Sequence, residues 1–64
     1  MTQKELLYLE DAIGHESSII TILDDSINSI EDNKLKAFLE KEYKSHEKMK
    51  QRLMNLLEAK ANEW

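Results

Sequence analysis

The sequence of 64 residues has no cysteine, no proline and only one glycine, Gly14. Without cysteine, the chain cannot form disulfide bonds or thiolate metal sites, and cysteine usage says nothing about its redox compartment. Proline and glycine are the residues that usually separate strands and turns, and they are almost missing here. Long helices are therefore the expected structure.

Long apolar runs are also missing. No segment approaches the roughly 20 consecutive apolar residues that a membrane-spanning helix needs. Residues 1–6 include Lys4 and Glu5 and lead into no sustained apolar run, so we expect no signal peptide. We therefore expect a soluble protein that is made in the cytoplasm and has no membrane partner, although later deposition elsewhere remains open.

Positive charge is scarce in the first half of the chain. Residues 1–32 hold eight acids and a single base, Lys4, for a net charge of −7, whereas residues 33–64 hold eight bases and five acids, for +3. The overall charge of −4 argues against a nucleic-acid partner, because affinity for phosphate backbones comes from Lys and Arg. An acidic half and a basic half of similar length are expected to lie side by side.

Apolar residues in the first half recur at the spacing of a helix. Steps of three and four residues alternate through Leu6, Leu9, Ile13, Glu16, Ile20, Leu23, Ile27 and Ile30. This alternation is a heptad seam, and Glu16 is its only polar member. Thr2 suits a helix N-cap, and Glu5 three residues later completes a capping box, so the sequence predicts a helix over about 3–30.

The second half predicts another helix, after a turn at about 31–33. Polar residues interrupt the apolar rhythm there, and Asp32 or Asn33 can cap a helix over about 34–61. Its seam reads Leu35, Leu39, Glu42, His46, Met49, Leu53 and Leu56, flanked by Phe38 and Leu57. Because the turn is short, the two helices must be antiparallel neighbours. The sequence thus predicts an all-α fold, with residues 1–64 forming one helical-hairpin domain.

Two helices that touch along one line leave a wide apolar surface uncovered. We expect Ile19, Phe38, Met49 and Leu57 to remain largely in water in a lone hairpin. A chain this short buries only about 60% of its unfolded surface, so small domains gain stability from disulfides, metals or oligomerisation. We therefore predict a homodimer that forms a four-helix, ferritin-like bundle, with docking onto a larger partner as the alternative.

Three polar residues interrupt the seams near their centres: Glu16, Glu42 and His46. Burying an unpaired carboxylate costs several kcal/mol, so the two glutamates need partners. Glu16 and His46 lie at equal distances from the turn, and Glu42 is one helical turn from His46. The three side chains are expected to converge on one layer or on two adjacent layers.

This polar layer has two main interpretations, and partial exposure of the three side chains at a loose or frayed interface is a third. In the first, the three residues form buried ion pairs and hydrogen bonds that fix the register and the dimer, and no cofactor is bound. In the second, they bind Fe, Mn or Zn, because a two-fold dimer would duplicate them into the carboxylate and imidazole ligands of a di-iron or di-manganese site. The pattern departs from that of ferritin-like proteins because Glu42 and His46 are four residues apart instead of three.

Four bases form a ridge at helical spacing in the second half: Lys41, Lys44, Lys48 and Arg52. We interpret the ridge as a solvated face, with binding to RNA or to an acidic partner as the alternative. No serine has the acid–base partners of a nucleophile, and the chain is too small to enclose an ordinary substrate pocket. We therefore predict that the protein is not an enzyme, unless a redox metal is bound.

Residues 2–16, TQKELLYLEDAIGHE, resemble the opening of short coat F-like spore coat proteins from endospore-forming bacteria. Residues 30–39, IEDNKLKAFL, together with His46 and the ending at 53–57, are also similar. The resemblance implies a ferritin-like helical fold, a place in the spore or its coat, other coat proteins as partners, and no established catalytic residues. Family members often have a second helix rich in Gln and His, whereas this chain has Lys, Glu and one His there.

Overall fold

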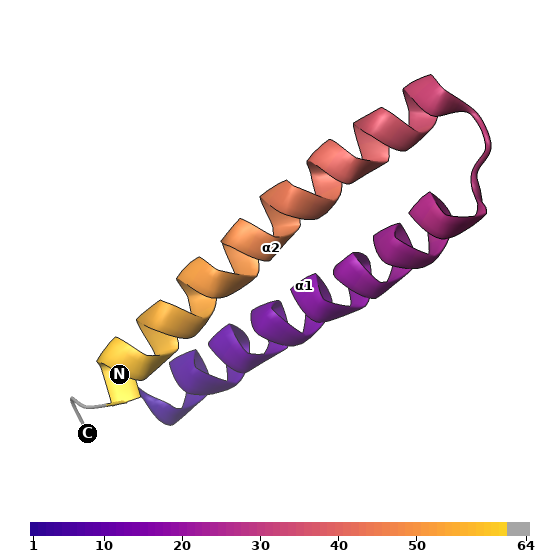
Figure 1. Ribbon diagram of the computed structural model, residues 1–64. Coiled ribbons are helices and arrows are strands. Elements are labelled where there is room, and N and C mark those ends of the chain that lie inside the picture. The colour runs from indigo at the N-terminus through magenta and orange to yellow at the C-terminus, as the bar shows by residue number, and fades with distance from the viewer. Residues whose placement is uncertain (62–64) are drawn as a thin grey trace.

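The computed structural model describes residues 1–61 as a hairpin of two helices (Figure 1). Helix α1 spans Gln3–Ser29 and helix α2 spans Asn33–Ala61. The helices run antiparallel, with the turn at one end of the hairpin and the start of α1 and the end of α2 at the other (Figure 1). Residues 1–61 contain no strand. The predicted all-helical hairpin is therefore confirmed.

Helix α1 begins with the predicted capping box. The backbone N–H of Glu5 donates to Oγ1 of Thr2 at 3.1 Å, and the backbone N–H of Thr2 donates to Oε1 of Glu5 at 2.7 Å. These two bonds satisfy donors that the first turn of a helix otherwise leaves without an acceptor. Local sequence therefore fixes where α1 starts.

The turn consists of residues 30–32, where the sequence predicted a turn at about 31–33. Ile30 leaves the helix with an extended backbone (φ −85°, ψ 135°), while its N–H still donates to the carbonyl of Ser26 at 3.0 Å. Asp32 caps α2, because its carboxylate accepts the backbone N–H of Leu35 at 2.8 Å. None of residues 1–61 has a positive φ, so this turn needs no glycine.

The contact line of α1 follows the predicted seam. All eight seam residues are half-buried against α2: Leu6, Leu9, Ile13, Glu16, Ile20, Leu23, Ile27 and Ile30. Their heptad spacing keeps one narrow stripe of α1 turned toward its antiparallel neighbour. The heptad rhythm alone was therefore enough to identify the inner face of α1.

The contact line of α2 differs from the prediction. Leu35, Met49 and Leu56 are exposed, whereas Lys50 and Leu57 are half-buried. The half-buried residues in the middle of the line are Leu39, Glu42, Tyr43, His46, Lys50, Leu53 and Leu57. The apolar stripe of α2 is wider than one contact line, and α1 covers only one edge of it. Leu57, expected in water, lies on the covered edge.

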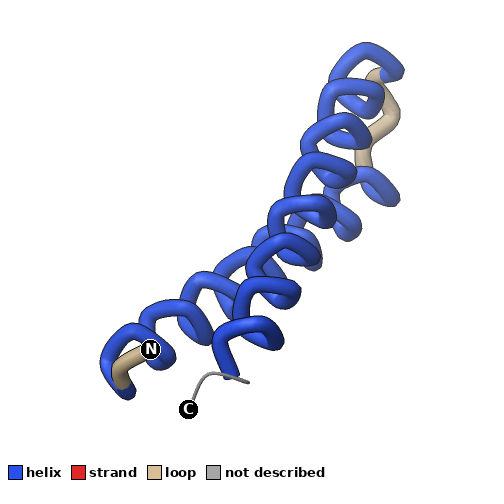
Figure 2. The backbone as a smooth tube through the Cα atoms, turned by 90° about the vertical axis from the view of Figure 1, so that its left-hand side faces the viewer, coloured by secondary structure: helices blue, strands red, loops and turns tan. Residues whose placement is uncertain are grey.

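The hairpin is too thin to enclose a core. Its principal extents are 48, 15 and 11 Å, and none of residues 1–61 is fully buried. Figure 2 shows the helices overlapping along their middle and diverging toward the chain ends. Neither helix contains a stretch that is long and apolar enough to cross a membrane within the described part of the chain.

Candidate functional site

Glu16 and His46 meet across the two helices. Oε2 of Glu16 lies 2.5 Å from Nδ1 of His46, and the two side chains are 17% and 30% exposed. When Nδ1 carries a proton it donates to the carboxylate, and a protonated imidazole makes this a charge-assisted bond, the stronger kind. Nε2 of His46 has no hydrogen-bond partner within residues 1–61. That nitrogen is available to a group from outside the hairpin.

The two helices hold this pair in the middle of the hairpin. Glu16 has thirteen residues of α1 on either side, and His46 lies one residue from the midpoint of α2. Because the helices are antiparallel and joined by a short turn, their midpoints lie at the same height. The prediction that Glu16 and His46 face each other is confirmed.

Glu42 is not part of the pair. It is half-buried and lies one turn before His46, but it forms no hydrogen bond or ion pair with Glu16 or His46. Within residues 1–61 no three His, Asp or Glu side chains are grouped so that they could hold a metal ion. One chain thus brings together two of the three predicted residues. The predicted metal site drew its ligands from two chains, so it stays a prediction.

The second notable feature is a set of exposed apolar side chains. Nine large hydrophobic residues are exposed: Leu7, Tyr8, Ile19, Ile22, Leu35, Phe38, Met49, Met54 and Leu56. Phe38, the one phenylalanine of the chain, is 57% exposed. Single exposed hydrophobic residues are normal on protein surfaces, but a contiguous group usually marks an interaction site. Whether these nine residues mark an interaction site therefore depends on whether they are contiguous.

Five of these nine residues, together with half-buried Ala12, form one face of the hairpin. A helix turns about 100° per residue, so residues separated by 7 or 11 positions lie nearly in line along it. On α2, such a line contains Phe38, Met49 and Leu56; on α1, it contains Tyr8, Ala12 and Ile19. Around its own helix axis, each line is rotated by about 80° from the contact seam. Viewed from the N-terminus of each helix, the two rotations have the same direction. In antiparallel helices, both lines then point to the same side of the hairpin, which we call the apolar face.

The opposite side of the hairpin is polar. Tyr43 lies there, and the negative charge of Glu47 is the main cause that raises the pKa of its phenol, followed by partial desolvation and the charge of Asp24. A shallow cleft on this side is lined by Ile20, Glu47, Lys50, Gln51 and Met54. The hairpin therefore has one apolar side and one charged side, as a helix pair in a larger bundle does.

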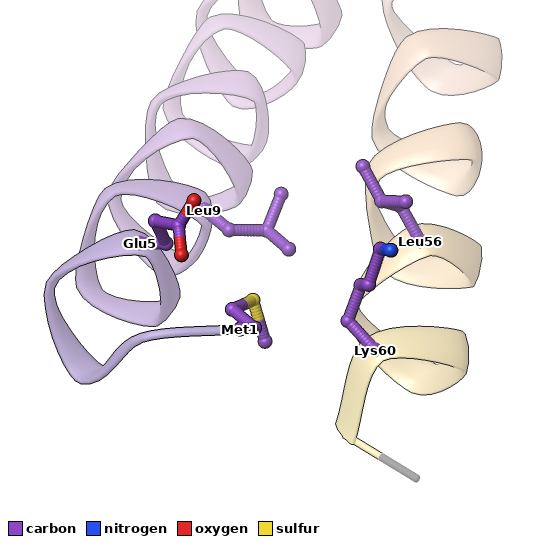
Figure 3. A pocket seen from close by; sticks show the side chains of 5 residues that line it. All are labelled: Met1, Glu5, Leu9, Leu56 and Lys60. Atoms are coloured by element: carbon purple, nitrogen blue, oxygen red, sulfur yellow. The ribbon is translucent and has the colours of Figure 1, made fainter. Parts of the chain in front are cut away.

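A wider cleft opens where the helices diverge (Figure 3). Its volume is about 400 Å³, and it is lined by Met1, Glu5, Leu9, Leu56 and Lys60. Leu9 and Leu56 point toward each other from the facing helices (Figure 3). The hydrogen bond from the Thr2 backbone N–H is the main cause that lowers the pKa of Glu5, and Lys60 adds a smaller effect. Because Leu56 also belongs to the apolar face, this cleft and that face are continuous.

Sequence reasoning found part of the apolar face and missed the rest. It placed Ile19, Phe38 and Met49 in water, but it assigned Leu56 to the seam and did not include Tyr8. Tyr8 and Leu56 are assigned to the apolar face by their rotation about the helix axis relative to the observed contact line. Comparisons with protein-family models, with curated proteins and with solved structures each find no match for this chain.

Proposed function

We propose that this chain is a small, non-catalytic structural or assembly protein that works as a homodimeric four-helix bundle. One observation carries the proposal. The hairpin exposes an apolar face, and none of residues 1–61 is fully buried. Two such hairpins, placed face to face, would remove Phe38, Met49 and Ile19 from water. At about 25 cal/mol per Å² of apolar area, that burial is the largest source of stability open to a chain of this size.

The size of the face suits a stable dimer. The hairpin measures 48 by 15 Å, so one broad side has a projected area of about 720 Å². Stable protein interfaces bury roughly 800 Å² on each partner. A second copy would therefore use nearly the whole apolar face.

The concentration dependence of thermal unfolding tests this proposal. Folding that depends on dimerisation makes the melting temperature rise with protein concentration, because association is linked to folding by mass action. We expect such a rise for the natural sequence and a much lower melting temperature for Phe38→Ser, which places a hydroxyl in the apolar face.

Leu7→Ser is the matched control. Leu7 is 56% exposed, almost the same as Phe38, but it points away from both the seam and the apolar face. We expect Leu7→Ser to melt within a few degrees of the natural sequence. Equal melting of the two variants, or a melting temperature independent of concentration, would contradict the proposal.

The biological setting that we propose is the spore or its coat, with other coat proteins as partners. The support is the resemblance of residues 2–16 and 30–39 to coat F-like proteins. In such a setting a small rigid dimer contributes surfaces for assembly instead of a reaction. The chain should then be detected by antibody in purified spores, and its restriction to vegetative cells would contradict this role.

A second candidate function is metal binding in the dimer core. One observation favours it: within residues 1–61 the Glu16–His46 pair leaves Nε2 of His46 without a hydrogen-bond partner, and Glu42 is half-buried one turn away. Ligands from two chains would fit Fe, Mn or Zn. We expect metal in protein that is purified without chelator, and less of it in Glu42→Gln. Absence of metal, together with no thermal shift on adding Fe(II), Mn(II) or Zn(II), would contradict this function.

A further inference from the structure

The proposed homodimer, on which this inference rests, can pair its apolar faces in two symmetric ways. If the two-fold axis runs along the bundle, each α1 lies against the partner's α2 and both turns lie at the same end. If the axis runs across the bundle, α1 lies against the partner's α1, α2 lies against the partner's α2, and the turns lie at opposite ends. Closed two-fold pairing is the commonest form of homodimer, and both arrangements satisfy it.

The two helices carry opposite net charges. Helix α1 has six acids and one lysine, for a net charge of −5, whereas α2 has eight bases and four acids, for +4. With the axis along the bundle, every helix has two neighbours of opposite charge. With the axis across the bundle, each helix has one neighbour of its own charge. Complementary charges favour the first arrangement and like charges oppose the second.

The charges lie where the second chain would meet them. On α2, exposed Lys34, Lys41 and Lys48 recur every seven residues, along the edge just outside the apolar line. On α1, exposed Asp11 lies on the corresponding outer edge. These edges border the groove between one chain and the other.

The height of each residue follows from the Glu16–His46 pair. Since Glu16 lies beside His46, position n of α1 lies beside position 62 − n of α2 in the same hairpin. A two-fold axis along the bundle leaves every residue of the partner at the same height as its equivalent in the first chain. Asp11 then lies near the partner's Arg52. With the axis across the bundle, the basic edge of α2 would instead face the same edge of the partner, with lysine against lysine and arginine.

We propose that the two-fold axis of the dimer runs along the bundle, so that acidic α1 of each chain lies against basic α2 of the other and both turns lie at one end. The basic ridge that sequence analysis assigned to solvent is then, in part, the border of this interface. The polar layer of each chain meets that of its partner at the same height. All four chain ends emerge together, at the end opposite the turns.

The distance between spin labels on the two turns tests this arrangement. The chain has no cysteine, so Glu31→Cys gives a single labelling site at an exposed turn position without a hydrogen bond. With the axis along the bundle, the two labels lie within about 20 Å, because packed helices have axes about 8–10 Å apart. With the axis across the bundle, they lie near the full 48 Å length of the hairpin.

A label at Ser18→Cys is the matched control. Ser18 is exposed and lies near the middle of the hairpin, so its two labels lie within about 30 Å in either arrangement. Short distances at both positions support the inference. A short distance at residue 18 with about 48 Å at residue 31 would overturn the inference and leave the dimer standing. No distance between chains at either position would overturn the dimer as well.

Discussion

Glu16 and His46 are thirty residues apart in sequence, and they meet at 2.5 Å in the middle of the hairpin. They are the only pair of side chains within residues 1–61 for which a hydrogen bond joins the two helices directly. Apolar contacts are not directional, so they specify the register of the two helices only weakly. The Glu16–His46 bond is directional and therefore specifies which residues of α1 and α2 lie opposite each other.

Removing one partner of the Glu16–His46 pair should destabilise the hairpin more than replacing both partners by apolar residues. We expect Glu16→Ala to lower the free energy of unfolding by about 1 kcal/mol, because it leaves a half-buried imidazole without its acceptor. The double replacement Glu16→Leu with His46→Leu should be as stable as the natural sequence or more stable, since apolar pairs often replace buried polar pairs without loss. Chemical denaturation of Glu16→Leu, His46→Leu and the double variant measures the coupling between the two side chains. Additive effects would show that the bond contributes nothing.

The capping box should make the start of α1 sensitive to acid. Because hydrogen bonds from Thr2 hold the pKa of Glu5 below its usual value, the folded chain binds a proton there less readily than the unfolded chain does. This contribution to stability is present above the usual carboxyl pKa and is lost as the pH falls through the lowered value.

The variant Glu5→Gln isolates that effect, since glutamine still accepts the N–H of Thr2 but does not titrate. Helicity followed by circular dichroism should fall more steeply on acidification for the natural sequence than for Glu5→Gln. Identical acid transitions for the two proteins would exclude this role of Glu5.

Lys50 is a polar residue on the contact line, and replacing it should stabilise the hairpin. It is half-buried and lines a cleft with Ile20 and Met54. We expect Lys50→Leu to raise the free energy of unfolding by about 1 kcal/mol, because leucine would bury apolar area against those two side chains. Lys44→Leu, at an exposed position of the same helix, should change it by less than about 0.5 kcal/mol. Equal gains in the two variants would show that the rise comes from helix propensity.

Local signals in the sequence were sufficient to predict the hairpin. Thr2 and Glu5 form a capping box through bonds between residues three apart, and Asp32 caps α2 in the same local way. The heptad rhythm of α1 is narrow, so all eight of its predicted seam residues are half-buried in the structure. These features depend on neighbouring residues, which a single sequence displays directly.

The inner face of α2 could not be predicted in the same way. Its apolar stripe is broad, and Leu56 and Leu57 are adjacent candidates for one contact position. Which of the two faces α1 depends on the rotation of the whole helix, and a partner helix, not local sequence, sets that rotation. The same rotation determines that Glu42 stays apart from the Glu16–His46 pair. The contact between Glu16 and His46 was therefore predictable, whereas the metal site with ligands from two chains stays a prediction.

The mass of the natural chain in solution is the most direct test of the homodimer. Sedimentation equilibrium over a series of concentrations measures that mass without a label or a substitution. The homodimer predicts twice the 7.5 kDa of a single chain. A folded, helical species that remains at 7.5 kDa at all concentrations would contradict the homodimer, and with it the use that we assign to the apolar face.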